Sequence, residues 1–354
     1  MLYNITYVLN NLFGEPYGFE ENPVNQNPVN RFKNRLDEKY VDSLAGREVI
    51  PSQALPTFDA DSPDLIEEMT KPRRLNGSFV IRGLIKNFDC YRKWNLDYFA
   101  ENFGDTKITV FSDGKETLNS RLGFCRRELI ELSISDFVRR LKNGENLYFN
   151  NASEIFYKHR KIVDDMELPR LNQTFGRTLG FSVNHIFFGR KGGGSALHCA
   201  NTSNFFFNAV GRKHWVLIEP QYSRFLRPVP SKDGMFSVSK MDCFDTGEDN
   251  PLLKLPRYEI TLEPGDMLFN AHWWWHGVRN LSDFSIAVAN RWTNHPVHML
   301  ANNLFYSHLV LYHPSTMSSG FSLMLSNLTG RDDGSRNAAY EKNHLDALAN
   351  TKGK

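Results

Sequence analysis

Two stretches of the sequence each place a histidine beside a turn. The first stretch runs from Ser195 to Trp215 and contains His198, and the second runs from Pro264 to Trp292 and contains His276. Each stretch has the pattern of two β-strands joined by a short turn. Neutral imidazole is a suitable ligand for first-row transition metals. The sequence therefore predicts that His198 and His276 meet at one metal ion.

Residue 200 determines how complete that metal site is. Two histidines and one carboxylate, with open coordination positions, form the usual site of non-haem iron, and the carboxylate usually follows the first histidine by two residues. Side chains alternate along a strand, so residue 200 shares a face with His198. This residue is Ala200, and the stretch reads His-Cys-Ala. We therefore expect a two-histidine site without the third protein ligand.

The rest of the chain supplies the strands that must hold these histidines. Short alternating segments separated by turn residues predict a mainly β protein with flanking helices, folded as an antiparallel jelly roll (a double-stranded β-helix). Between residues 76 and 150, helices are predicted at Leu96–Phe103, with Asn95 as its cap, and at Ser135–Leu141. The predicted strands are Phe79–Ile85, Lys107–Phe111, Leu147–Phe149, Phe181–Arg190, Tyr258–Leu262, Met267–Asn270 and Ser285–Asn290.

Three regions follow from the sequence. Residues 1–75 are predicted to form an irregular arm, because residues 15–75 are rich in proline, asparagine and charge, with one helix near Arg31–Leu44. Residues 76–296 form the predicted jelly-roll domain, and residues 297–354 form a predicted C-terminal helical extension. Within the domain, the long connection Glu219–Arg257 is interpreted as a lid or binding loop.

Composition sets limits on partners and compartment. The 354 residues are 41% hydrophobic and carry a formal net charge of +2, without a block of like charges, which argues against nucleic acid as an obligatory partner. The four cysteines Cys90, Cys125, Cys199 and Cys243 form no paired motif and suggest free thiols in a reducing, cytoplasmic setting. No apolar segment is long enough for a membrane helix, and no membrane partner is expected.

Several motifs, taken together, resemble the JmjC and cupin-like oxygenases that use Fe(II) and 2-oxoglutarate, especially those of the asparaginyl-hydroxylase type. The resemblance extends over roughly residues 75 to 295. It departs from the family at Ala200 and at Asn270–His272, where an apolar residue and a proline are usual. The matching segments are Phe79–Leu84 with Trp94, Ser195, Asn204, Phe206, Gly211–Lys213, Pro264–Asp266, Trp274–His276 and Asn290.

The resemblance implies an enzyme that binds Fe(II), 2-oxoglutarate and O2, with His198 and His276 as the iron ligands. Lys213 matches the lysine that pairs with the distal carboxylate of 2-oxoglutarate. A lysine inside an apolar barrel is costly unless it is paired, and a dicarboxylate supplies that partner. Further residues are implied near the cosubstrate or the iron, namely Ser195, Tyr148, Asn204 and Asn290, with Arg291 as an alternative anchor. In such hydroxylases the C-terminal helices pair two subunits, which implies a homodimer.

Three interpretations of Ala200 remain open. In the first, chloride or bromide occupies the vacant position, as in Fe(II)/2-oxoglutarate halogenases that resemble this chain there. In the second, water, a carboxylate from the predicted lid or His272 fills the position, and the protein is a hydroxylase. In the third, the protein is a catalytically inactive binding module. The substrate is expected to be a small molecule or a peptide. The lid carboxylates considered are Asp242, Asp245 and Glu248.

Overall fold

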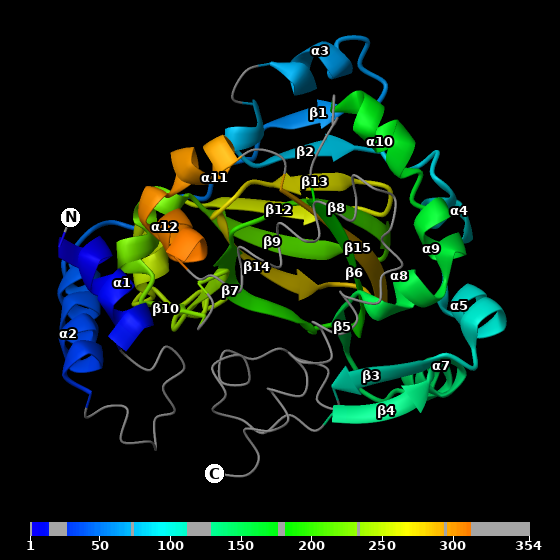
Figure 1. The fold of residues 1–354 in the computed structure, drawn as a ribbon, viewed down its shortest axis with the longest axis horizontal. Coiled ribbons are helices and arrows are strands. Elements are labelled where there is room, and N and C mark those ends of the chain that lie inside the picture. Colours follow the sequence, from blue (N-terminus) through cyan, green and yellow to red (C-terminus); the bar gives the residue numbers. More distant parts are fainter. Residues whose placement is uncertain are drawn as a thin grey trace.

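Two β-sheets face each other at the centre of the molecule (Figure 1). In this computed structural model we describe residues 2–13, 27–71, 74–111, 129–175, 181–231, 234–293 and 296–312. The seven-stranded sheet has the order β1 (Thr57–Asp59), β2 (Phe79–Arg82), β13 (Met267–Asn270), β8 (Ser203–Val210), β15 (Phe284–Thr293), β6 (Phe181–Arg190), β5 (Phe149–Ala152). The six-stranded sheet has the order β10 (Pro228–Pro230), β11 (Phe236–Ser239), β7 (Gly194–Ala200), β14 (Trp275–Asn280), β9 (Lys213–Ile218), β12 (Tyr258–Leu262). The predicted jelly roll is confirmed.

Contacts between the sheets identify their inward faces. Phe206 of β8 and Trp215 of β9 meet edge to face, with ring centroids 4.8 Å apart. Because side chains alternate along a strand, the neighbours Phe205 and Phe207 lie on the opposite face of the seven-stranded sheet. Phe207 contacts Phe88, which directly precedes the helix α4 (Asp89–Lys93). One face of this sheet therefore lines the barrel interior, and the other lies under helices.

Helices cover the outer face of the seven-stranded sheet. They are α4, α5 (Leu96–Phe103), α7 (Ile134–Lys142), α9 (Arg160–Asp164) and α10 (Leu168–Thr174). Phe99 of α5 packs edge to face on Phe188 of β6, with 4.7 Å between ring centroids. Asn95 caps α5 by accepting a hydrogen bond from the Tyr98 amide, as predicted. Beside these helices, β3 (Lys107–Phe111) and β4 (Leu129–Ser133) form a separate hairpin-like pair.

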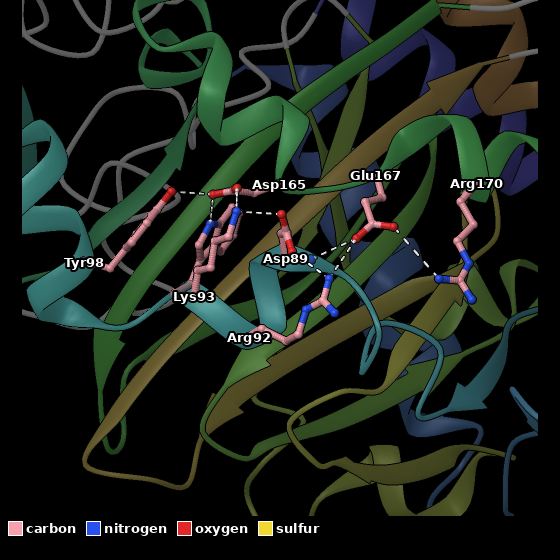
Figure 2. Close-up of polar contacts among 8 residues, drawn as sticks. Asp89, Arg92, Lys93, Tyr98, Asp165, Glu167 and Arg170 are labelled. Atoms are coloured by element: carbon pink, nitrogen blue, oxygen red, sulfur yellow. Dashed lines mark hydrogen bonds and ion pairs between the residues drawn. The ribbon is translucent and has the colours of Figure 1, made fainter.

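A polar cluster joins these helices at their ends (Figure 2). The buried carboxylate of Asp165 accepts hydrogen bonds from the Trp94 indole at 2.9 Å and the Tyr98 hydroxyl at 2.5 Å. Lys93 bridges Asp165 and Asp89, with N–O distances of 3.3 and 2.6 Å. The cluster thus links α4, α5 and the end of α9. Its hydrogen bonds and ion pairs serve to hold these helices together.

The N-terminal region is more regular than the predicted arm. It contains α1 (Leu2–Phe13), α2 (Pro28–Asp42), β1 and α3 (Leu65–Thr70), and β1 pairs in parallel with β2. The single helix expected near Arg31–Leu44 corresponds to α2. The helix α1 was not predicted because its pattern is mixed: it buries Asn10 and Asn11 together with Tyr3 and Tyr7, and exposes Leu2 and Phe13. The Asn10 amide donates to Asn30 of α2.

The C-terminal helices α11 (Pro296–Asn302) and α12 (Leu304–Tyr312) pack on the same side of the molecule as α1 and α2 (Figure 1). Tyr306 of α12 stacks on Tyr7 of α1 with 4.1 Å between ring centroids. The Trp273 indole donates to Ser307 of α12 at 2.8 Å. The described part of the predicted extension therefore packs within its own chain, and the expected homodimer stays a prediction. The remainder of that extension, and Cys125, lie outside the described residues.

The described parts of the connection Glu219–Arg257 do not form the lid that its composition suggested. It contains two 3-10 helices, Pro220–Phe225 and Pro251–Lys254, and the strands β10 and β11. β11 pairs antiparallel with β7, with Val238 opposite His198. The segment therefore extends the six-stranded sheet and packs on it.

Two further expectations concern the whole chain. Cys90, Cys199 and Cys243 are buried free thiols. Within the described parts of the chain, none of the helices has the length and apolarity needed to cross a membrane.

Candidate functional site

His198 and His276 lie directly opposite each other on neighbouring strands. β7 and β14 are antiparallel, and these two residues are register partners. Their imidazole centroids are 4.1 Å apart, and the rings are inclined by 48°. The His276 ring also stacks on Trp215, at 5.5 Å, which places the pair on the inward face of the six-stranded sheet. Both histidines are nearly buried, with 8% and 7% of their surface exposed.

Backbone carbonyls hold the Nδ1 atom of each imidazole. His198 Nδ1 lies 2.8 Å from the Ala196 carbonyl, and His276 Nδ1 lies 3.0 Å from the Trp274 carbonyl. An Nδ1–H that donates to a carbonyl leaves Nε2 as the nitrogen with a lone pair, which is the form that binds a metal. Asn270 Nδ2, which is a donor, also lies 2.9 Å from His276 Nδ1, so this nitrogen has both a donor and a carbonyl acceptor within reach, and the tautomer argument applies to His198 alone. Asn270, one of the departures from the family pattern, therefore helps to fix this ring.

A β-bulge brings Ser195 to the same face as His198. The register of β7 and β14 shifts between His276 and Val278, so that Ser195 lies opposite Val278 and His198 lies opposite His276. Three residues separate Ser195 from His198, and regular alternation would place them on opposite faces. The extra residue in β7 corrects this, which is a common use of a bulge near a functional site.

No third protein ligand joins the histidine pair among the described residues. No group of three or more His, Cys, Asp or Glu side chains in these ranges could hold a metal ion. Ala200 follows His198 by two residues on β7 and shares its face, so a methyl group stands where a carboxylate would be.

The alternative third ligands lie elsewhere. Asp242, Asp245 and Glu248 are exposed. Their segment packs on Gly277, where an added Cβ would overlap the Cys243 sulfur, and Gly277 faces away from the interior beside inward-facing His276. His272 is buried, with Nδ1 2.6 Å from the Asn201 carbonyl, and it does not come together with His198 and His276 as a group of three ligands. The proposal that one of these groups completes the site is therefore wrong for this structure.

Lys213 is a buried base without a carboxylate partner among the described residues. Its exposed fraction is 2%, and its ammonium donates to Asn280 Oδ1 at 2.6 Å. The ammonium also lies 5.9 Å from the centre of the Phe206 ring. Burial lowers the pKa of Lys213 to about 7. A buried ammonium with one neutral partner is an unfavourable arrangement that a bound carboxylate would relieve.

Tyr148 and Asn280 share the space over Gly189 of β6. A Cβ added to Gly189 would lie 2.8 Å from Asn280 Nδ2 and 2.9 Å from the Tyr148 ring. Because Asn280 is the hydrogen-bond partner of Lys213, Tyr148 lies at the same end of the barrel as Lys213. The sequence had not identified Asn280 as a site residue. Its position opposite Lys213, four residues after His276 on β14, could have suggested it once the register was known.

Asn204 faces the interior, whereas Asn290 does not. Asn204 is the register partner of both Asn270 and Arg291. Its Oδ1 is buried and has no hydrogen-bond partner among the described residues. Asn290 is the register partner of Phe205, on the helix-covered face, and donates to Asn184 at 2.7 Å. The structure therefore separates Asn290 from the histidine pair, and the implied cofactor contact of Asn290 is wrong.

Comparison with known proteins places this geometry in a family. Residues 75–298 match the model of the cupin-like domain. The chain is 28% identical over 315 residues to tRNA wybutosine-synthesizing protein 4 of Gibberella zeae, covering 84% of this chain and 27% of that protein. It is 24% identical to lysine-specific demethylase 8 of Xenopus tropicalis, covering 60% of this chain and 47% of that protein. It is 25% identical to tRNA wybutosine-synthesizing protein 5 of Gallus gallus, covering 70% of this chain and 79% of that protein. The chain therefore spans about a quarter of the length of the first of these relatives and about half of the length of the second. The chain belongs to the cupin-like domain family, with JmjC-type relatives.

Proposed function

We propose that this protein is an Fe(II)- and 2-oxoglutarate-dependent oxygenase that acts on an unactivated C–H bond through a two-histidine iron site. The observation that carries the proposal is the placement of His198 and His276 as register partners with rings 4.1 Å apart. The carbonyl contact at His198 Nδ1 supports Nε2 of that ring as an iron ligand. When bound, iron with 2-oxoglutarate and oxygen would supply the oxidising chemistry.

The residues at the Lys213 end fit 2-oxoglutarate. Lys213 would hold the distal carboxylate, and Asn280 keeps the ammonium in place. Asn280 is four residues from His276 along β14, which corresponds to about 13 Å along the strand. A lysine side chain and a five-carbon dicarboxylate together can extend over that length. Tyr148 and Ser195 line the same interior and would add hydrogen bonds to the cosubstrate.

A halogenase is the second candidate, because of Ala200. Its methyl group leaves room beside the iron position, and no described carboxylate replaces the missing acid. A chloride or bromide ion in that position would restore the negative charge that an aspartate would have contributed. In this form of the proposal, the halide is transferred to the substrate carbon in place of a hydroxyl group.

One experiment separates these functions. The protein is titrated anaerobically with Fe(II) and 2-oxoglutarate, with chloride, with bromide and without either, and the visible charge-transfer absorption is recorded. Succinate is then measured after oxygen is added. Succinate that forms without halide supports the hydroxylase, and succinate that requires halide supports the halogenase. Absence of both the absorption and succinate under every condition refutes the oxygenase and favours a binding module.

A further inference from the structure

The turn that leads into His276 contains a strained residue. It joins β13 to β14 and consists of residues 271–274. Within it, Trp273 has a backbone φ of +64°, in the left-handed region that is exceptional for a bulky side chain. Such a conformation is unfavourable and persists only where the surrounding structure holds it. The contacts of Trp273 therefore show what holds this turn.

The C-terminal helix α12 holds the side chain of Trp273. The indole N–H donates to Ser307 Oγ at 2.8 Å, and the Ser307 hydroxyl donates in turn to the Met299 carbonyl, also at 2.8 Å. Tyr306 packs edge to face on the indole, with 5.5 Å between ring centroids. Trp273 and Ser307 are both fully buried. The indole is thus fixed by a hydrogen bond and by packing on one helix.

The backbone of Trp273 holds the end of the strand that carries His198. The Trp273 amide donates to the Ala200 carbonyl at 2.8 Å. Ala200 is the last residue of β7, two residues after His198, and His276 follows Trp273 by three residues on β14. Trp273 therefore connects α12 to both strands of the histidine pair, and its backbone conformation sets the direction of the amide that makes this connection.

A neighbouring indole and serine make a similar hydrogen bond without a strained backbone. Trp275 donates its indole N–H to the buried Ser223 Oγ at 2.9 Å, and the Ser223 hydroxyl donates to the Pro220 carbonyl at 2.5 Å. Trp275 is already part of β14 and does not have a positive φ. Loss of either serine hydroxyl thus removes the same kind of hydrogen bond, but of the two serines it is Ser307 that acts on a strained turn.

We propose that Trp273 is a positioning residue of the two-histidine site, and that α12 acts through it to hold His198 and His276 opposite each other. When the hydrogen bond to Ser307 is lost, Trp273 relaxes toward a negative φ. Its amide then turns away from Ala200, and the start of β14 moves with it. This inference rests on the proposed function in that the histidine pair binds a metal ion, but the connection between α12 and the turn can be tested without metal.

The first test uses Co(II) alone as the probe, because it binds imidazole sites and its visible absorption depends on the ligand geometry. The full chain is titrated with Co(II), and the variants are Ser307→Ala and, as the matched control, Ser223→Ala. We expect Ser307→Ala to bind Co(II) about ten- to a hundredfold more weakly than the wild type, as is typical when the outer support of metal ligands is removed. Ser223→Ala should bind it as the wild type does. Equal effects in the two variants would indicate a merely structural role and would overturn the inference.

The second test asks whether the indole–hydroxyl bond carries the effect. Trp273→Phe removes the N–H donor and keeps an aromatic ring in the same place. We expect Trp273→Phe to weaken Co(II) binding as strongly as Ser307→Ala does, and the double variant to weaken it no further, because both substitutions remove the same bond. Losses that add in the double variant would refute the connection through this bond.

Amide hydrogen exchange in the metal-free protein separates this inference from the proposed function. We expect Ser307→Ala to speed exchange of the Trp273 amide about tenfold or more, and Ser223→Ala to leave its rate unchanged, since exchange requires the bond to Ala200 to open. If the wild type does not bind Co(II), the metal site of the proposed function fails, whereas faster exchange in Ser307→Ala still supports the connection between α12 and the turn. An unchanged exchange rate in Ser307→Ala refutes the inference whether or not the metal binds.

Discussion

Replacement of Lys213 by methionine should increase the stability of the protein and weaken its binding of 2-oxoglutarate. Lys213 is fully buried, and burial lowers its pKa from an ordinary value of 10.5 to about 7. Methionine has a similar length, carries no charge and fits the apolar surroundings provided by Phe206. The same side chain is thus expected to be unfavourable for the empty fold and necessary for ligand binding.

The magnitude follows from the pKa. A decrease from 10.5 to about 7 corresponds to a penalty on the order of 5 kcal/mol for the charged lysine. The substitution also removes the hydrogen bond to Asn280, which contributes roughly 1.5–3 kcal/mol. The net gain in the free energy of unfolding is therefore about 2–3.5 kcal/mol where Lys213 is protonated in both states.

The gain should depend on pH in a defined direction. The folded pKa is lower than the unfolded one, so between about pH 7 and pH 10.5 the unfolded state binds more protons. The wild type therefore gains stability as the pH rises through this window. The advantage of Lys213→Met should be complete below pH 7 and should be lost by about pH 10.5.

The assay is urea unfolding of the metal-free protein at about pH 6 and about pH 10, together with 2-oxoglutarate titration of the Fe(II)-loaded protein. Lys86→Met, at an exposed lysine, is the control for loss of a charge. We expect 2-oxoglutarate affinity to fall about tenfold or more in Lys213→Met only. An unchanged affinity would refute Lys213 as the anchor, and a stability difference that is independent of pH would refute the argument from burial.

Three other predictions concern the same interior. Binding of 2-oxoglutarate at about pH 8 should take up close to one proton, because an unliganded Lys213 with a pKa of about 7 is mostly neutral at that pH and a bound carboxylate raises its pKa. Calorimetry in buffers of different ionisation enthalpy measures the proton uptake, and zero uptake contradicts the pairing of Lys213 with the carboxylate. Ala200→Asp should increase Fe(II) affinity about tenfold or more by adding a third ligand on the face of His198, and should abolish any halide effect on the visible absorption; an unchanged metal affinity would place the iron elsewhere. Gly189→Ala should weaken 2-oxoglutarate binding, since its Cβ would lie 2.8 Å from Asn280 Nδ2 and displace the partner of Lys213. Gly77→Ala, where the nearest atom to the added Cβ is 3.9 Å away, should leave that affinity unchanged, and equal affinities in both variants would show that Asn280 does not act on the cosubstrate.

Local signals in the sequence were sufficient for several features. The cap residue Asn95 and the apolar spacing after it predicted α5 with its correct bounds. The alternating segment Phe181–Arg190 was predicted as a strand and is β6. His198 and Lys213 were recognised from short motifs, because each stands at a turn beside an apolar strand. These features depend only on residues within a few positions of one another.

Where a prediction depended on distant segments, the sequence was less informative. The connection Glu219–Arg257 has the composition of a surface loop, yet β11 within it pairs with β7. The helix α1 presents both asparagines and tyrosines to the protein, and Asn30, the partner of Asn10, is 20 residues away. In both cases the local pattern of hydrophobic residues was uninformative because contacts with distant segments contribute to the packing.

The sequence by itself determined which residues could do chemistry and the type of fold that holds them: two histidines beside turns, a missing acid at Ala200, a lysine ahead of an apolar strand and a jelly roll. Only the tertiary structure decided which side chains face the site. The bulge in β7 turned Ser195 inward, and the register of β15 placed Asn290 outward and Arg291 inward. The physical reason is that side chains alternate with a period of two, so that one residue of register or one bulge exchanges the two faces of a strand.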